Sequence, residues 1–324
     1  MIAAPDMRRF ICTAAQPDRC AARVREQISC VNSKPLPADV LKRFRGIIRR
    51  LAVSLACLLL FEVHLQAQVW NGTSSVNWTT GANWAGGSPP TSTGTATFNA
   101  PTPSSPTVNA SVAAGQLLFT GTANQNFSGT NTLTLNGVGG VGISNQVNYT
   151  PTFANPITLG ASQTWQAANA AGGGMTFNGA VSLSANTLTL DPQNAANIVT
   201  INSVISGTGA LNKTGAGTVV LSGTNSYTGV TTINAGTLRA TGGNAIGNSS
   251  TVTLASVAGA TLDLADSSET IGPLAGGGNV TLGAGTLTTG TTTSTTYAGV
   301  ISGTGGLTKV GTGVFTLTGN NTYT

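Results

Sequence analysis

The chain has 324 residues, 14 of them Lys or Arg and 9 Asp or Glu, with a formal net charge of +5, and only 7% are charged where a soluble globular domain has about 25%. Eleven basic and five acidic residues, all four Cys and the single His lie before residue 69, and only three basic and four acidic residues follow. The net charge therefore gives no support for a nucleic-acid partner, and residues 69–324 offer no disulfide framework, no Cys or His metal site and no His-dependent nucleophile.

The first predicted element is an export signal at residues 41–67. Residues 42–50 are basic, residues 51–61 form an apolar run, and a short segment ending at Ala67 offers the cleavage site of a signal peptide. The apolar run is shorter than the ~20 residues needed to span a bilayer, so we expect no transmembrane helix in the mature chain. We interpret residues 1–40 as an unstructured extension or the product of a misplaced translation start.

Residues 68–105 are rich in tryptophan. Trp70, Trp78 and Trp84 are close in sequence at a point where a stack of similar coils would need a cap over its first member. We predict that this segment is an N-terminal cap. A β-sandwich module that binds glycans on these rings is the alternative.

From residue 106 to residue 324 the sequence alternates small polar and aliphatic residues without a helical period. In a strand this alternation places Leu and Val on one buried face and Thr on the other, and β-branched Thr favours extended backbone. Glycine-rich groups at 137–140, 172–174 and 276–278 are expected to separate the strands. We predict an all-β fold, with strands that include 132–135, 187–190, 252–254, 261–264 and 280–282.

One long segment occurs twice. Residues 204–228 and 300–324 align without a gap at 15 of 25 positions, and Lys213 corresponds to Lys309 and Tyr227 to Tyr323. Stacked coils of about 20–30 residues account for such a copy, so we predict a β-solenoid with the two copies about four coils, or roughly 20 Å, apart. A sandwich or barrel would also use many short strands, but it would not account for the copy.

The repeated pattern ISGxGxLxKxGxGxxxLxGxNxYT, continued in the first copy to residue 238, resembles the autotransporter-associated β-strand repeat, also called the passenger-associated transport repeat. Residues 204–238 match the whole unit, and residues 300–324 match it up to the last residue. The resemblance implies a right-handed parallel β-helix in the passenger of a secreted or surface-displayed bacterial protein, where the repeats aid export. Large members continue into a C-terminal anchor or sorting element, so we expect a C-terminally truncated product.

The acidic residues of the body are the candidates for catalysis, because parallel β-helices also include polysaccharide lyases and hydrolases. Asp263, Asp266 and Glu269 form one cluster, and glycoside hydrolysis needs two carboxyl groups about 5–9.5 Å apart. The alternation places Asp263 outward on a strand, Asp266 lies in a turn composition, and Asp191 before Pro192 is interpreted as a turn residue. We interpret the cluster as solvated and predict no catalytic residue.

The remaining candidates for binding are the two repeat lysines and the glycine-rich strings around them. We interpret Lys213 and Lys309 as solubilising, edge-protecting charges rather than a binding stripe. The strings lack the GxxxxGK[ST] pattern of a phosphate loop, and the chain has neither the calcium-binding nonapeptide nor an EF-hand loop. We therefore predict no cofactor and no metal site.

Together these observations predict a non-enzymatic, exported β-solenoid. It would be the structural passenger or stalk of an autotransporter-like adhesin, secreted or at the outer membrane and cell surface of a Gram-negative-type bacterium. Its partners would be the export machinery and a surface glycan or a host or matrix polymer. The alternative function is that of a carbohydrate-active β-helix enzyme.

Overall fold

The computed structural model describes residues 68–99, 105–257 and 259–324. The predicted extension 1–40 and export signal 41–67 lie outside the described residues. The chain divides into two units, and all described residues belong to the second, Leu65–Thr324. Within the described ranges no helix has the length and apolarity needed to cross a membrane.

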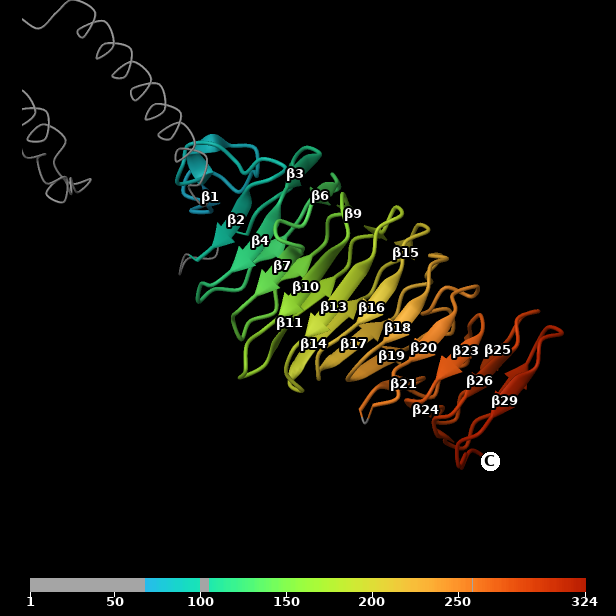
Figure 1. Ribbon diagram of the computed structural model, residues 1–324. Helices are drawn as coiled ribbons and strands as arrows, with labels where there is room; N and C mark the ends of the chain where they lie inside the picture. Colours follow the sequence, from blue (N-terminus) through green and yellow to red (C-terminus); the bar gives the residue numbers. More distant parts are fainter. Residues whose placement is uncertain (1–67, 100–104, 258) are drawn as a thin grey trace, which may run out of the picture. The chain divides into compact units, whose positions relative to one another are not determined.

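The described part of the second unit is a parallel β-solenoid (Figure 1). From β4 onward, each complete coil adds a strand to a twelve-stranded sheet, then to a nine-stranded sheet, then in most coils to a third face. A single turn of 3-10 helix, η2 (Gly81–Asn83), precedes β2. The twelve-stranded sheet has the order β1 (Gln68–Val69), β2 (Thr95–Phe98), β4 (Gln116–Phe119), β7 (Val141–Asn145), β10 (Gln163–Ala167), β13 (Leu188–Pro192), β16 (Leu211–Lys213), β18 (Thr231–Ile233), β20 (Val252–Leu254), β23 (Leu274–Gly276), β26 (Thr295–Tyr297) and β29 (Phe315–Leu317).

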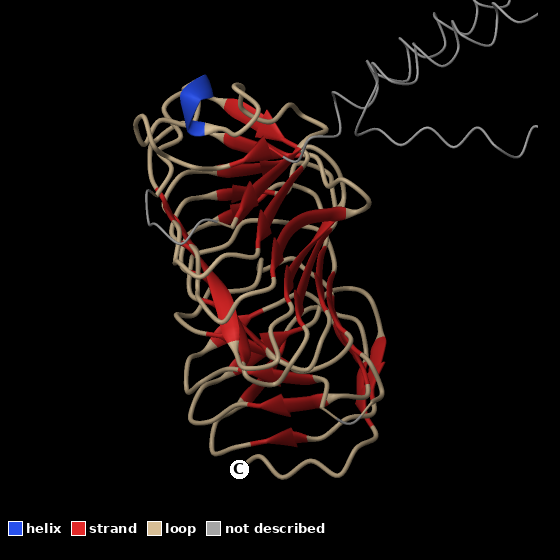
Figure 2. Ribbon diagram, turned by 90° about the vertical axis from the view of Figure 1, so that its left-hand side faces the viewer, coloured by secondary structure: helices blue, strands red, loops and turns tan. Residues whose placement is uncertain are grey.

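The other two faces follow the same axis (Figure 2). The nine-stranded sheet contains β5 (Asn126–Phe127), β8 (Thr152–Phe153), β11 (Gly173–Phe177), β14 (Asn197–Ile201), β17 (Thr218–Leu221), β19 (Thr237–Ala240), β21 (Thr261–Asp263), β24 (Asn279–Thr281) and β27 (Ile301–Ser302). The third face begins with the five strands β3 (Val112–Ala114), β6 (Leu133–Leu135), β9 (Ile157–Leu159), β12 (Val181–Ser182) and β15 (Ile205–Ser206). It resumes later in the three strands β22 (Glu269–Thr270), β25 (Leu287–Thr289) and β28 (Leu307–Lys309).

Strands of successive coils pair in parallel and in register. Gln163 pairs with Leu188, and Leu211 pairs with Thr231, so one coil takes between 20 and 25 residues at these points. Leu188 and Leu190 of β13 are buried while Thr189 between them faces outward. The prediction of an all-β solenoid is therefore confirmed, and so is the prediction that aliphatic side chains point inward and threonines point outward.

Two of the three predicted glycine-rich breakers lie partly inside strands. Gly173 and Gly174 form the start of β11 instead of a loop, and Gly276 ends β23. A Cβ on Gly174 would lie 1.9 Å from the carbonyl oxygen of Ile198 in the next coil. These glycines allow neighbouring coils to approach closely, which a composition rule for loops does not distinguish from a turn.

Aromatic rings fill the interior of the first coils. Phe153 stacks on Phe127 and on Phe177 with ring centroids 4.8 Å apart in both pairs, and Trp165 stacks on Phe177 at 4.5 Å. This separation matches the spacing of about 4.7–4.9 Å between neighbouring strands. Parallel, in-register pairing therefore brings equivalent rings into contact.

Candidate functional site

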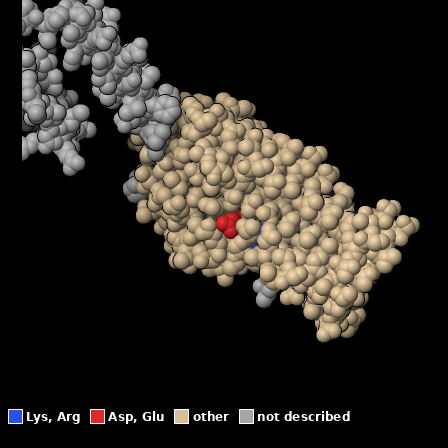
Figure 3. All heavy atoms as spheres, viewed as in Figure 1, with Lys and Arg blue, Asp and Glu red and all other residues tan. Residues whose placement is uncertain are grey.

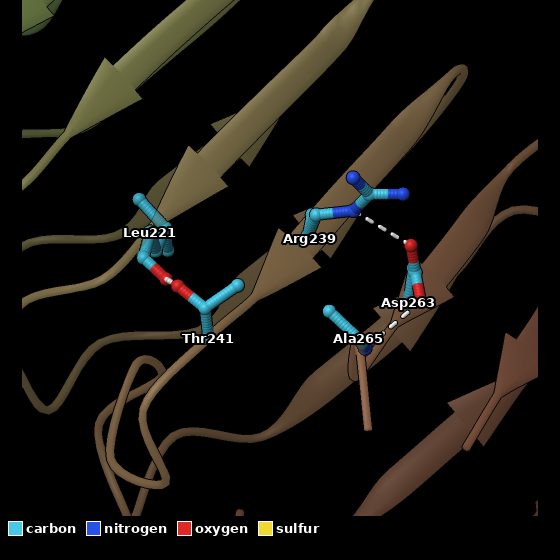
Figure 4. A network of polar contacts seen from close by, with 5 residues as sticks. All are labelled: Leu221, Arg239, Thr241, Asp263 and Ala265. Atoms are coloured by element: carbon cyan, nitrogen blue, oxygen red, sulfur yellow. Dashed lines mark hydrogen bonds and ion pairs between the residues drawn. The ribbon is translucent and has the colours of Figure 1, made fainter. Parts of the chain in front are cut away.

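Asp263, the first residue of the predicted acidic cluster, ends strand β21. Its Oδ2 accepts a hydrogen bond from Arg239 Nε at 2.8 Å, and its Oδ1 accepts the main-chain N–H of Ala265 at 2.9 Å (Figure 4). Arg239 lies on the adjacent strand β19, directly opposite Asp263 in the register. The carboxylate is thus occupied by a cross-strand ion pair and a turn contact.

Asp266 lies in the turn that the sequence predicts. Ala265 and Asp266 both have positive φ, 48° and 65°, a conformation that favours glycine but that Asp tolerates better than most residues. The Oδ1 of Asp266 accepts the main-chain N–H of Ala284 in the following coil at 2.9 Å. The side chain is exposed but anchored to its neighbour.

Glu269 departs from the prediction of a solvated cluster. Its side chain is 2% exposed, and its carboxylate accepts the main-chain N–H groups of Ala245 at 3.0 Å and Ile246 at 2.9 Å. Burial raises the pKa of Glu269 above its ordinary value of 4.5, and the two hydrogen bonds oppose that rise. The interpretation of Glu269 as a solvated residue is wrong, because the preceding coil covers it.

Glu269 and Asn225 together bridge a gap in the third face. This face has no strand between β15 and β22 in the described chain. Across the gap, Ile205 N–H donates to Asn225 Oδ1 at 2.6 Å, and Asn225 Nδ2 donates to the carbonyl of Ala245 at 2.5 Å. Glu269 then accepts the N–H groups of the same loop. Side chains here replace the main-chain ladder, and the partners of the buried carboxylate are main-chain N–H groups.

Asp191 lies on a strand rather than in a turn. It belongs to β13, and its two oxygens accept hydrogen bonds from Thr214 Oγ1 at 2.9 Å and Gln193 Nε2 at 3.1 Å. The turn prediction from Pro192 is wrong because this proline continues the strand. Asp191 pairs with Gln166 of β10 and faces outward.

Lys213 is buried, so its interpretation as a solubilising charge is wrong. The residue is 1% exposed and stands in the inward column of the twelve-stranded sheet, opposite Leu190 and Ile233. Its Nζ donates to the carbonyl oxygens of Thr214 at 2.6 Å, Gly215 at 2.8 Å and Ala235 at 2.8 Å. Burial lowers the pKa of Lys213 to about 8, and the charge of Asp191 opposes that shift.

Lys309, its counterpart in the second copy, is exposed and lies on another face. It ends β28 of the three-stranded sheet, whereas Lys213 ends β16 of the twelve-stranded sheet. Among the described residues, the Nζ of Lys309 donates only to the carbonyl oxygens of Val310 at 2.5 Å and Gly311 at 3.0 Å. The two lysines therefore form no common stripe.

The three tryptophans of the first segment point into the molecule. Trp70, Trp78 and Trp84 are at most 2% exposed, and Trp84 packs edge-on against Trp70 at 5.0 Å and Trp78 at 4.8 Å. Strand β1, just before them, pairs with β2 in the twelve-stranded sheet. The rings are not available as a glycan platform, and the segment is continuous with the solenoid rather than a sandwich.

Asn83 organises the loop around these rings, and sequence reasoning missed it. Its Oδ1 accepts the N–H groups of Ser74 and Ser75, and its Nδ2 donates to Asn77 O at 2.9 Å. The missed Asn225 had a usable signal, since Asn321 stands at the same position of the second copy. Asn83 has no such copy in the chain.

The outward faces carry uncharged hydroxyl and amide groups. Figure 3 shows one small acidic patch on a face that is otherwise nearly free of charge. Thr152, Thr176 and Thr200 stand side by side on the nine-stranded sheet. Within the described ranges no three His, Cys, Asp or Glu residues are grouped closely enough to hold a metal ion. This arrangement suits repeated weak hydrogen bonding to a neutral surface.

Comparisons with known proteins agree with the repeat identified in the sequence. Residues 211–240 and 307–324 match the passenger-associated-transport-repeat family. A part of the chain is similar to the Adhesin BmaC autotransporter of Brucella suis biovar 1 (strain 1330), with 41% identity over 161 residues. That alignment covers 44% of this chain and 5% of the adhesin. No solved structure matches the chain.

Proposed function

This chain carries passenger-associated transport repeats, and on that premise we propose that it is a structural passenger or stalk segment of an autotransporter-like adhesin. The observation that carries the proposal is the contrast between charged and uncharged polar side chains. The charged side chains are mostly engaged in contacts within or between coils, whereas the row of outward threonines Thr152, Thr176 and Thr200, called the Thr ladder, is available to a partner. Such a segment extends along one axis and presents the same surface chemistry at each coil.

The organisation of the chain forms part of the same proposal. Residues 1–40 precede an export signal at 41–67, residues 68–105 cap the first coil, and residues 106–324 wind as a right-handed β-helix. The buried tryptophan cluster supports the cap. The segment would be exported, with the export machinery as a transient partner, and displayed at the surface of a Gram-negative-type bacterium or secreted.

The proposed adhesion partner is a surface glycan or a host or matrix polymer. Single hydroxyl or amide contacts are weak in water, but a polymer that spans several coils makes many of them at once. Because the Thr ladder is uncharged, binding should change little with ionic strength. The segment is proposed to be non-enzymatic.

Adhesion is tested with the full chain immobilised and offered neutral and acidic polysaccharides and matrix proteins at low and high salt. We expect retention of a neutral polymer at both salt concentrations. Replacing Thr152, Thr176 and Thr200 together by Val removes the hydroxyl groups and keeps the β-branched shape, so it should reduce that retention with little change in the thermal unfolding midpoint. Retention that disappears in high salt, or that is unaffected by the triple replacement, would contradict the proposed surface.

The enzyme alternative is tested with the same polysaccharides. A lyase or hydrolase would release unsaturated or reducing sugar, and Asp263→Asn or Asp266→Asn would abolish that release. The contacts of both carboxylates with neighbouring main chain and Arg239 favour the structural role. Sugar release sensitive to either substitution would overturn the non-enzymatic proposal.

A further inference from the structure

The two repeat copies provide an internal comparison of one motif in two surroundings. Three polar residues recur in them: Lys213 and Lys309, Asn225 and Asn321, and Tyr227 and Tyr323. In the first copy another coil follows and packs on these residues, because β18 pairs with β16. In the second copy no later described strand pairs with β28. Differences between the copies therefore show which contacts the following coil provides.

Contacts with the preceding coil and within the motif are the same in both copies. The N–H of Ile205 donates to Asn225 Oδ1 at 2.6 Å, and that of Ile301 donates to Asn321 Oδ1 at 2.8 Å. Each lysine also donates to the carbonyls of the next two residues in the chain. These contacts form although the copies lie on different faces, so the motif itself specifies them.

In the first copy, the lysine and the asparagine each donate a further hydrogen bond to the following coil. Lys213 Nζ donates to Ala235 O at 2.8 Å, and Asn225 Nδ2 donates to Ala245 O at 2.5 Å. In the second copy, Asn321 Nδ2 donates instead to Gly319 O of its own coil at 3.1 Å. Lys309 has only its two local carbonyls within the described residues and is exposed.

Tyrosine adds a third contact. The hydroxyl of Tyr227 is fully buried and lies 2.8 Å from Thr231 Oγ1, which in turn lies 2.8 Å from Ser250 Oγ. Thr231 and Ser250 lie near the start and the end of the coil that follows. Tyr323 is only partly buried.

We propose that the Lys, Asn and Tyr of each repeat form a docking surface that recognises the following β-coil. The coil that fits offers two main-chain carbonyls and a hydroxyl pair, as residues 229–250 do, and Lys309, Asn321 and Tyr323 present the same surface. This inference goes beyond the proposed function, because it concerns how coils are joined and not what the outer surface binds.

The recognised coil must also carry a glycine beside the lysine. Gly236 has φ +63°, and a Cβ at this position would lie 2.7 Å from Lys213 Nζ and 2.4 Å from Gly217 O. Any other residue would be strained and would push against the ammonium group. The docking surface therefore requires a glycine at this position of the following coil, in addition to a matching backbone shape.

The first experiment compares matched substitutions in the full chain, Lys213→Met against Lys309→Met. Lys213→Met leaves three carbonyls without their shared donor, so the thermal unfolding midpoint should fall by about 3–8 °C, whereas Lys309→Met should change it by less than about 1 °C. Amide exchange in Lys213→Met should accelerate in residues 229–254 and not in residues 181–206. Equal midpoint shifts, or acceleration on both sides of the lysine, would overturn the proposal.

The second experiment adds a coil after Thr324. Residue 324 corresponds to residue 228 of the first copy, so a copy of residues 229–254 is appended directly after Thr324. Acetylation by an activated ester should modify Lys309 of the unextended chain at least about tenfold faster than Lys213, and the extension should slow Lys309 to the rate of Lys213.

An extension with alanine at the position of Gly236 is the matched control, and it should leave Lys309 reactive. If Lys309 is equally reactive with and without the intact extension, the docking surface does not exist as proposed. Polymer retention by the outer surface is measured on the same proteins, and its loss alone would contradict adhesion without affecting this result.

Discussion

Aromatic rings make up nearly half of the buried hydrophobic side chains in residues 68–177, whereas the interior of residues 181–317 is mainly aliphatic. We call these regions the aromatic half and the aliphatic half. All seven charged residues after residue 68 lie in the aliphatic half, and residues 68–190 contain none. The aromatic half contains the ring contacts formed by Trp70, Trp78, Trp84, Phe98, Phe119, Phe127, Phe153, Trp165 and Phe177.

The change from aromatic to aliphatic side chains occurs along a single inward column of the nine-stranded sheet. In register, this column runs through Phe127, Phe153, Phe177, Ile201, Leu221 and Ala240. The rings stack because strand spacing and ring stacking distance agree. Buried side-chain hydrogen bonds between coils occur in both halves, from Asn145 and Gln163 in the aromatic half and from Asn225 and Glu269 in the aliphatic half. One backbone geometry therefore accepts two kinds of core.

Phe153→Ala should have the largest effect. It removes a ring that stacks on both sides and leaves a cavity, so we expect a loss of about 3–5 kcal/mol in the free energy of unfolding. Ile201→Ala, in the same column, should cost less, within the usual range of about 2–5 kcal/mol for aliphatic truncation. Urea denaturation of both variants makes the comparison. An equal or larger loss for Ile201→Ala would remove the distinction between the halves.

Ala240→Phe tests whether the aliphatic half can accept a ring. Ala240 is fully buried at the end of the column, so the added ring should overpack the interior and cost about 1–3 kcal/mol. Val220→Phe, outward on the neighbouring strand β17, is the control and should cost little. Thermal unfolding of both chains gives the result. A stabilised Ala240→Phe variant would show that the aliphatic half has room for aromatic rings, so that the two halves differ in sequence and not in the space available.

Glu269→Gln tests the burial of the Glu269 carboxylate by the pH dependence of stability. Since the folded pKa of Glu269 is raised above 4.5, folding favours its protonated form, and its contribution to stability is greatest below that pH and decreases as the pH rises through the folded pKa. The free energy of unfolding of the unsubstituted chain, relative to Glu269→Gln, should therefore fall between pH 4 and pH 8. Denaturation curves across this range provide the measurement. A difference that stays constant with pH would contradict the burial of the carboxylate.

Arg239→Ala should have the smallest effect. The Arg239–Asp263 pair lies on the outer face with the arginine half exposed, so its removal should cost no more than about 1 kcal/mol. High salt should reduce even this difference. The unfolding midpoint at low and high salt measures it. A loss as large as that of Ile201→Ala would mean that surface charge, rather than the interior, holds the aliphatic half together.

The strands were more predictable than the sites. Alternation identified β6, β13, β20, β21 and β24, because the side chains of a strand alternate between faces whatever the neighbours are. Asp266 was likewise placed in its turn by local composition. Lys213 and Glu269 were misjudged because their partners are contributed by other coils: Ala235 lies 22 residues from Lys213, and Ala245 lies 24 residues from Glu269.

The sequence by itself determined the solenoid, the inward and outward parity of its strands and the repeated motif with its local hydrogen bonds. All of these depend on backbone geometry over a few residues or on direct similarity between segments. Only the tertiary structure decided where each copy lies. In register, Lys213, Ile233, Leu254, Gly276 and Tyr297 form one column of the twelve-stranded sheet, so four coils take the 84 residues from 213 to 297. The copies are 96 residues apart, so β16 and β28 fall on different faces. Burial of a repeated side chain depends on the coil stacked over it, and for that reason the same lysine is enclosed in one copy and exposed in the other.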